Sequence, residues 1–169
     1  ENSNKDAAAV FEAVSDRLVT FRDLVLGAVI GNIFDYGVKG HEISDDFFSF
    51  VIQEFEKGFH IDDTSRILPL CSDIVYFTDN CGEIIFDRAL LSFLKNRGSH
   101  ITLVVRDAFM LNDATMTDVE TLDLRSVADE VYTTGCGKEI GIRFDYLPGN
   151  VMQALDRCTL LISKGMANY

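Results

Sequence analysis

The clearest pattern of apolar and polar positions in this chain lies in residues 74–83, where an apolar run stops abruptly at polar residues. Such a run is typical of a buried parallel strand, and the helix-like run of residues 84–98 follows it directly. In open α/β sheets, ligands lie just outside the carboxyl ends of the strands. Asp79, Asn80 and Glu83 therefore fall where this kind of fold places its chemistry.

The first third of the chain predicts helices only. Residues 6–18 carry an amphipathic stripe, and residues 20–33 are apolar enough for a buried helix. A third helix is predicted to begin near Ser44 or Asp45, either of which can cap it, and to end at Gly58. We therefore expect residues 1–60 to form an α-helical N-terminal part.

From residue 73 onward, the pattern changes to strands that alternate with helices. The predicted strands are residues 73–78, 100–106, 130–134 and 159–165. Apolar strands alternating with helices predict a parallel sheet flanked by helices, which is a Rossmann-like α/β fold. Because right-handed crossovers place the carboxyl ends of all these strands on one edge, the loops that follow them should meet there.

Composition and charge narrow the class of protein. The 169 residues suffice for one domain with a proper core, and 47% of them are hydrophobic. The formal net charge of -12, without a cluster of Lys and Arg, argues against a nucleic acid or an anionic membrane as partner. An acidic protein can still bind a small phosphate ester if a metal ion supplies the positive charge.

The cysteines and the chain ends give two further expectations. The four cysteines form no Cys-x-x-Cys pair, so we expect free thiols in a reducing, cytoplasmic environment. The sequence holds no apolar run of about 18 residues, and its first residues do not show a basic stretch followed by an apolar one. The last predicted strand is followed by a short loop and then the end of the chain, whereas such a loop normally leads to a covering helix. We therefore expect residues 1–169 to be one domain of a longer protein.

Charged and amide side chains follow the predicted strands. After the first strand come Asp79, Asn80 and Glu83, after the second Arg106, Asp107, Asn112 and Asp113, after the third Gly135 to Lys138, and after the fourth Lys164 and Asn168. Carboxylate and amide oxygens are ligands of hard divalent ions, and a lysine can neutralise the remaining charge of a phosphate. This division of labour is common in phosphoryl transfer.

Several of these residues also have a purely structural interpretation. Asp79 and Asn80 could cap the helix that follows them. Asn112 and Asp113 could form an Asx-turn without a ligand role. Residues 135–141, GCGKEIG, carry the Gly-x-Gly of a dinucleotide or S-adenosylmethionine loop, but the spacing differs and the following residues do not predict the required helix.

Four motifs in order resemble one family. GNIFDYG, FTDNCGEIIFD, LNDATMTD and LLISKGMANY are similar to motifs of the metal-dependent damage-control phosphatases, formerly a domain of unknown function. The resemblance is to the archaeal-type branch, which is related to the phosphatase domain of some pantothenate kinases. It implies a helical N-terminal part before a Rossmann-like core. It also implies hydrolysis of small phosphate esters, such as sugar phosphates or damaged phosphometabolites, with Mg²⁺, Mn²⁺, Co²⁺ or Ni²⁺.

The resemblance also implies roles for individual residues. Asp79, Asn80 and Asp113 match the ligands of one divalent metal ion, and Lys164 matches a lysine that binds the substrate phosphate. The implied catalytic residues are therefore Asp79, Asp113 and Lys164. In the implied mechanism, a metal-activated water attacks the phosphoryl group, and a covalent variant would use Asp79 as nucleophile.

The substrate side of the pocket is implied by further motif positions. Asn32 and Asp35 match the Gly-Asn-x-x-Asp segment. Glu83 and Asp87 match further motif positions, and of these we assign Glu83 to the substrate side together with Lys164. The chain departs from the family pattern at Arg106–Ala108, where relatives often carry a Lys-Gly pair.

Two other functions stay open on the sequence. One is S-adenosylmethionine-dependent methylation of carboxylates, which the loop of residues 135–141 favours locally. The other is a non-catalytic module that binds a divalent metal.

Overall fold

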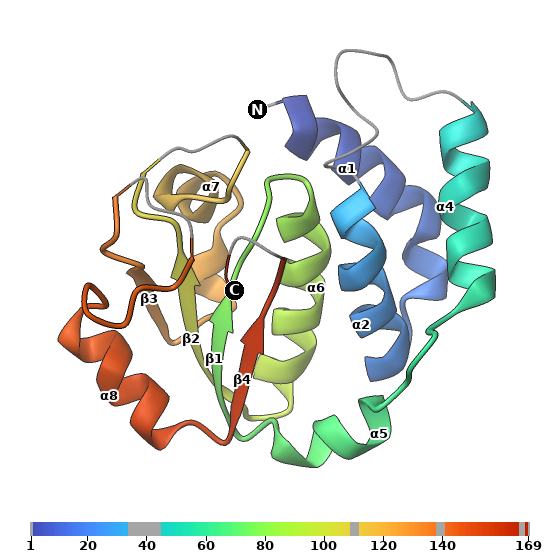
Figure 1. Ribbon diagram of the computed structural model, residues 1–169. Helices are drawn as coiled ribbons and strands as arrows, with labels where there is room; N and C mark the ends of the chain where they lie inside the picture. The colour runs from blue at the N-terminus through green and yellow to red at the C-terminus, as the bar shows by residue number, and fades with distance from the viewer. Residues whose placement is uncertain (1, 34–44, 109–111, 138–140, 166–167, 169) are drawn as a thin grey trace.

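The structure is a computed structural model that describes residues 2–33, 45–108, 112–137, 141–165 and residue 168 (Figure 1). A central sheet lies between a layer of helices from the first half of the chain and a single helix on the opposite side (Figure 1). The predicted α/β fold with a helical N-terminal part is confirmed.

The sheet consists of four parallel strands in the order β3-β2-β1-β4. The strands are β1 (Asp73–Phe77), β2 (His100–Val105), β3 (Glu130–Thr133) and β4 (Leu160–Ser163). In register, Asp73 of β1 is opposite His100 of β2, and Ile74 of β1 is opposite Leu160 of β4. All four carboxyl ends therefore lie on one edge, with β1 between β2 and β4.

In the described part of the chain, four α-helices precede the first strand and three connect successive strands. They are α1 (Asn2–Val14), α2 (Phe21–Ile30), α4 (Asp45–Lys57), α5 (Thr64–Ile67), α6 (Glu83–Asn96), α7 (Met116–Thr121) and α8 (Gly149–Arg157). In Figure 1, α6 lies against the sheet, α2 lies beside α6, and α8 covers the opposite face. The short helix α5 was not predicted, and the first predicted helix ends at Val14 instead of residue 18.

Alternation along β1 divides the core between the two faces of the sheet. Ile74 and Tyr76 point to the face covered by α6, where they pack with Leu91 and Leu94. Val75 and Phe77 belong to a separate cluster with α8. Because α2 packs on α6 as well, the first turns of α6 are covered by the sheet on one side and by α2 on the other. Polar residues on these turns are therefore forced into the interior.

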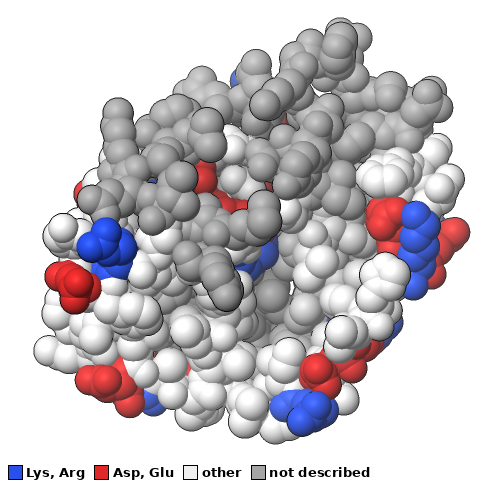
Figure 2. All heavy atoms as spheres, viewed as in Figure 1, with Lys and Arg blue, Asp and Glu red and all other residues white. Residues whose placement is uncertain are grey.

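The visible face of the molecule carries no large patch of positive charge among its described residues (Figure 2). On the face shown in Figure 2, the described Lys and Arg side chains are scattered among acidic and uncharged residues rather than gathered into a patch. All four cysteines are free thiols. Among the described residues, no helix is both long and apolar enough to cross a bilayer.

Candidate active site

The loops after β1 and β2 are joined to each other at the carboxyl edge of the sheet. Asn80 and Asp113 form an isolated antiparallel bridge, and the Ala114 amide donates to the Asp79 carbonyl at 2.8 Å. The topology therefore brings two of the segments that carry predicted metal ligands side by side. Residue Gly82, with φ of 83°, is the N-cap of α6, and no side chain caps that helix. The interpretation of Asp79 and Asn80 as side-chain caps is wrong for this structure.

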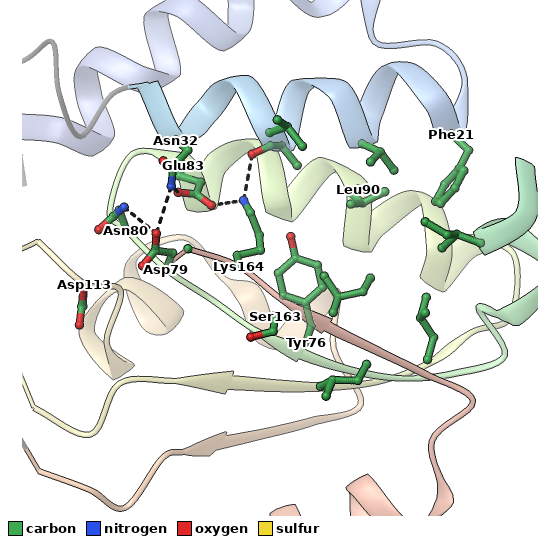
Figure 3. A pocket seen from close by; sticks show the side chains of 18 of the residues that line it. Phe21, Asn32, Tyr76, Asp79, Asn80, Glu83, Leu90, Asp113, Ser163 and Lys164 are labelled. Carbon is green, nitrogen blue, oxygen red and sulfur yellow. Dashed lines mark hydrogen bonds and ion pairs between the residues drawn. The ribbon is translucent and has the colours of Figure 1, made fainter. Parts of the chain in front are cut away.

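A cavity of about 930 Å³ opens beside this edge, between α2, α6 and β4. One end of its wall is apolar and includes Phe21, Val25 and Leu90 (Figure 3). Its polar end contains every predicted site residue that the structure describes, namely Asn32, Asp79, Asn80, Glu83, Asp113 and Lys164. The remaining predicted residue, Asp35, lies outside the described residues.

Two amides hold the Asp79 carboxylate. Asn32 Nδ2 donates to Asp79 Oδ2 at 3.0 Å and to Glu83 Oε2 at 2.8 Å. Asn80 Nδ2 donates to the same oxygen of Asp79 at 2.9 Å. Asn32 comes from the end of the α2 segment, so this bridge connects the helical layer to the strand end (Figure 3).

Lys164 is enclosed by acceptors. Its Nζ donates to the Ala28 carbonyl of α2 at 2.9 Å and to Asp87 Oδ1 at 2.5 Å, and it forms an ion pair with Glu83 Oε1. A lysine ammonium has three N–H groups, so these three partners use all of them. The Lys164 side chain is 11% exposed, and those of Glu83 and Asp87 are 0% exposed.

Two members of this cluster had no role assigned from the sequence: Asp87, which matches a family motif position, and Tyr76, which was not singled out. Asp87 follows Glu83 by four residues on α6, which places both carboxylates on one face of the helix. The Tyr76 hydroxyl donates to Asp87 Oδ1 at 2.8 Å. The i, i+4 spacing of the two acidic residues could have indicated Asp87, whereas Tyr76 looks like an ordinary core residue of β1.

The electrostatics of the site favour an additional positive charge. Burial, together with the carboxylates of Glu83 and Asp113, raises the pKa of Asp79 to about 6. Burial and Glu83 likewise raise the pKa of Asp87 to about 6, although Lys164 acts against this. Burial opposes the charge of Lys164, but Asp87 and Glu83 raise its pKa above the ordinary value. Three buried carboxylates around one ammonium therefore attract a cation.

The loop after β4 packs directly on Asp79. Gly165 has φ of 74°, and a Cβ there would lie 1.8 Å from Asp79 Oδ2, so only glycine fits. Asn168 Nδ2 donates to the Thr78 carbonyl at 2.7 Å and to the Lys164 carbonyl at 2.8 Å. These bonds tie the end of β4 to the end of β1 beside the site.

A family model for the damage-control phosphatase ARMT1-like domain matches residues 1–169. The chain belongs to this family. The resemblance found in the motifs is thereby confirmed.

The chain is also similar to individual proteins. A damage-control phosphatase of Archaeoglobus fulgidus is 42% identical over 151 residues, which cover 88% of this chain and 52% of that protein. An uncharacterized protein of Methanocaldococcus jannaschii is 32% identical over 181 residues, covering all of this chain and 58% of its own length. A crystal structure of a DUF89 family protein from Pyrococcus horikoshii matches with a TM-score of 0.86 and 26% identity, over 98% of this chain and 59% of that one. The chain thus spans little more than half the length of these relatives.

The donor chemistry at the strand ends suits a hard divalent ion of the kind this family uses, but Asp113 does not join one cluster with Asp79 in this structure. Asp79, Asn80 and Asp113 offer carboxylate and amide oxygens, which Mg²⁺ and Mn²⁺ prefer. Asp113 Oδ2 lies 3.2 Å from Arg106 Nε, and in Figure 3 Asp113 stands apart from the network around Asp79. Within the described part of the chain, no three His, Cys, Asp or Glu side chains converge closely enough to hold a metal.

Proposed function

We propose that the protein is a metal-dependent phosphatase that hydrolyses small phosphate esters, such as sugar phosphates or damaged phosphometabolites. Family membership supports this proposal, as does the name of the relative from Archaeoglobus fulgidus. The observation that carries it is the position of Asp79, Asn80 and Asp113 on two bridged loops at neighbouring strand ends, where they line one cavity with Lys164.

In this proposal, Asp79, Asn80 and Asp113 hold one divalent ion, which is Mg²⁺, Mn²⁺, Co²⁺ or Ni²⁺. When bound, such an ion polarises the phosphoryl group and lowers the pKa of a bound water enough to make it a nucleophile. Asn32 and Asn80 keep the Asp79 carboxylate oriented through their amide hydrogen bonds. Asp79 and Asn80 are buried, and burial strengthens these interactions.

The charges around the cavity support a requirement for the metal. Asp79, Glu83 and Asp87 outnumber the single ammonium of Lys164, so a phosphate ester alone would be repelled. A divalent ion at the Asp79 end would cancel that excess of negative charge. Lys164 then neutralises charge on the phosphoryl oxygens, with Asn32, Asp35 and Glu83 on the substrate side. Because its three N–H groups already have partners, a direct contact requires Lys164 to exchange one of them.

The alternative functions receive less support. The family match does not favour S-adenosylmethionine-dependent methylation, and part of the glycine loop at residues 138–140 lies outside the described residues. A covalent mechanism would need Asp79 as nucleophile, whereas we assign Asp79 to the metal. The single-domain boundary, the longer chain and the cytoplasmic location stay predictions.

The test is hydrolysis of a generic phosphate monoester by metal-stripped protein, with Mg²⁺, Mn²⁺, Co²⁺ and Ni²⁺ added back one at a time. We expect turnover to return with at least one ion and to be abolished in Asp79→Ala and Asp113→Ala. Asp129→Ala is the matched control, since Asp129 pairs with Lys95 at the opposite edge of the sheet. Metal binding without turnover would support the non-catalytic module instead, and saturable S-adenosylmethionine binding would support methylation.

A further inference from the structure

Asp87 binds the Lys164 ammonium directly, and Tyr76 binds Asp87. No role in the site has been assigned to either residue so far. The Tyr76 hydroxyl and Lys164 Nζ both donate to the same atom, Asp87 Oδ1, at 2.8 and 2.5 Å. Tyr76 belongs to β1 and Asp87 to α6, while Lys164 follows β4. Three elements of the fold therefore meet at one carboxylate oxygen.

Burying these ionisable side chains in the core costs free energy of folding. Tyr76 and Asp87 are 0% exposed, and Asp87 Oδ2 is buried with no hydrogen-bond partner among the described residues. Replacing a buried ion pair by apolar residues of similar volume is often neutral or stabilising, so such a pair is weak evidence for a purely structural role. Conversely, ionisable groups gathered by burial and specific partners beside a cavity are characteristic of functional sites.

The contacts around the Lys164 ammonium show how it is held in place. The ammonium donates to Asp87 of α6 and to the Ala28 carbonyl of α2, and it pairs with Glu83, which lies toward Asp79 (Figure 3). Glu83 in turn shares the Asn32 amide with Asp79. A shift of the ammonium would therefore change its position relative to the carboxylate that we assign to the metal.

We propose that Tyr76 and Asp87 are positioning residues that anchor the Lys164 ammonium at the inner wall of the cavity, at a fixed place relative to Asp79. The Tyr76 hydroxyl orients the Asp87 carboxylate, and Asp87 holds the lysine. The consequence for phosphate binding rests on the proposed function, whereas the anchoring itself does not. Neither residue touches the substrate in this proposal.

The first experiment measures the anchoring without any turnover. The protein is treated with acetic anhydride, and the rate of acetylation at each lysine is followed by mass spectrometry. Lys95 is the internal reference, because its side chain is 33% exposed and its ammonium also pairs with an aspartate, at 2.6 Å. We expect Lys164 to react at least about tenfold more slowly than Lys95 in the unmodified protein, since burial and all three hydrogen bonds protect it.

Two substitutions then release the anchor to different degrees. Asp87→Asn removes the charge and keeps the shape, so we expect acetylation of Lys164 relative to Lys95 to rise by about tenfold. Tyr76→Phe removes only the hydroxyl and should fold readily, and we expect a smaller rise of about threefold. Tyr132→Phe is the matched control, because its hydroxyl also donates to a carboxylate, Glu130 Oε2 at 2.9 Å. Unchanged protection of Lys164 in both Tyr76→Phe and Asp87→Asn would overturn the proposal.

The second experiment separates positioning from a general loss of structure. With the activating metal saturating, we expect kcat/KM for a phosphate monoester to fall about tenfold in Asp87→Asn and about threefold in Tyr76→Phe. The dissociation constant of the metal should stay within about twofold, because neither residue contacts the proposed ligands. A merely structural defect would weaken metal binding and catalysis together, which would also overturn the proposal. If the unmodified protein shows no metal-restored turnover, the proposed function fails, and the acetylation rates alone decide whether the anchor exists.

Discussion

The two edges of the sheet both carry networks of charged residues, but in opposite environments. At the amino edge, the first residues of three strands, Asp73, His100 and Glu130, lie beside Arg157, and these side chains are 24 to 40% exposed. At the carboxyl edge, Glu83, Asp87 and Lys164 are 0 to 11% exposed. The same types of residue therefore pair in contact with solvent at one edge and within a low dielectric at the other.

The difference in exposure separates the two networks energetically. Exposed ion pairs are screened and contribute little, roughly 0 to 1 kcal/mol each. Buried charges lose their hydration, so they need fixed partners, and a missing partner costs several times more. At the carboxyl edge, charged groups whose burial costs free energy lie beside a cavity. This combination is expected of an active site.

The largest expected effect is that of Lys164→Met. The substitution leaves the fully buried Glu83 and Asp87 without their cation, so we expect a loss of roughly 3–5 kcal/mol in the free energy of unfolding at pH 7. Urea unfolding measures it. Lys95→Met is the control, and its exposed pair with Asp129 should be worth no more than about 1 kcal/mol. Adding Asp87→Asn to Lys164→Met should recover part of the loss, and equal effects of the two lysine substitutions would contradict the comparison between the edges.

A smaller effect is expected for Gly165→Ala, which tests the close approach of the loop after β4. The new Cβ would collide with Asp79 Oδ2, so either the loop or the carboxylate must move. A displacement of this size at a reacting site costs about a hundredfold in kcat/KM. Gly98→Ala is the matched control, because Gly98 also has positive φ, 90°, but a Cβ there meets nothing within 4 Å. Activity that falls equally in both variants would mean that backbone strain, rather than the contact with Asp79, is responsible.

The pH dependence of stability should also differ between the edges. Burial and Glu83 raise the folded pKa of Asp87 to about 6, from an ordinary value of 3.8. The stability contribution of a carboxyl with a raised pKa is fully present below the unfolded pKa and is lost as pH rises through the folded pKa. Lowering the pH from 7 to 5 should therefore stabilise the metal-free protein by about 1 kcal/mol more than it stabilises Asp87→Asn.

Asp129 at the amino edge supplies the control for this pH experiment. Partial burial acts against it, but hydrogen bonds from Lys95 and the Ile101 amide lower the pKa of Asp129 below 3.8. Its contribution is therefore present above the unfolded pKa and is lost only as pH falls below that value. The unmodified protein and Asp129→Asn should then gain equally between pH 7 and 5 in urea titrations, whereas a smaller gain in Asp129→Asn would remove the contrast.

Much of the fold could be predicted because its signals are local. The apolar run before Asp79 and the polar break after it identified β1 within one residue, and the alternation of strands with helices gave the parallel sheet. The handedness of the crossovers then brought Asn80 and Asp113 to one edge, where the structure has them bridged. The roles assigned to the site residues stay predictions.

The parts that could not be predicted depend on contacts between distant segments. Tyr76 fits the inward alternation of a core strand, and nothing nearby in the sequence indicates that its hydroxyl meets Asp87. The Lys164 ammonium donates to the Ala28 carbonyl, although the two residues are 136 positions apart in the chain. Gly165 looked like the end of a strand, although its lack of a side chain is required by Asp79.

The smallest expected effect is at the amino edge, in Arg157→Gln. Arg157 Nη2 lies 2.7 Å from Glu130 Oε1 and Nε lies 3.3 Å from Asp73 Oδ2, yet its side chain is 37% exposed. Because water replaces these partners at little cost, we expect a loss of no more than about 1 kcal/mol, which shrinks further in high salt. Urea unfolding at two salt concentrations measures this, and the phosphatase assay should be unchanged. A loss as large as that of Lys164→Met would mean that exposure does not separate the two networks, and the inference that burial identifies the functional edge would fail with it.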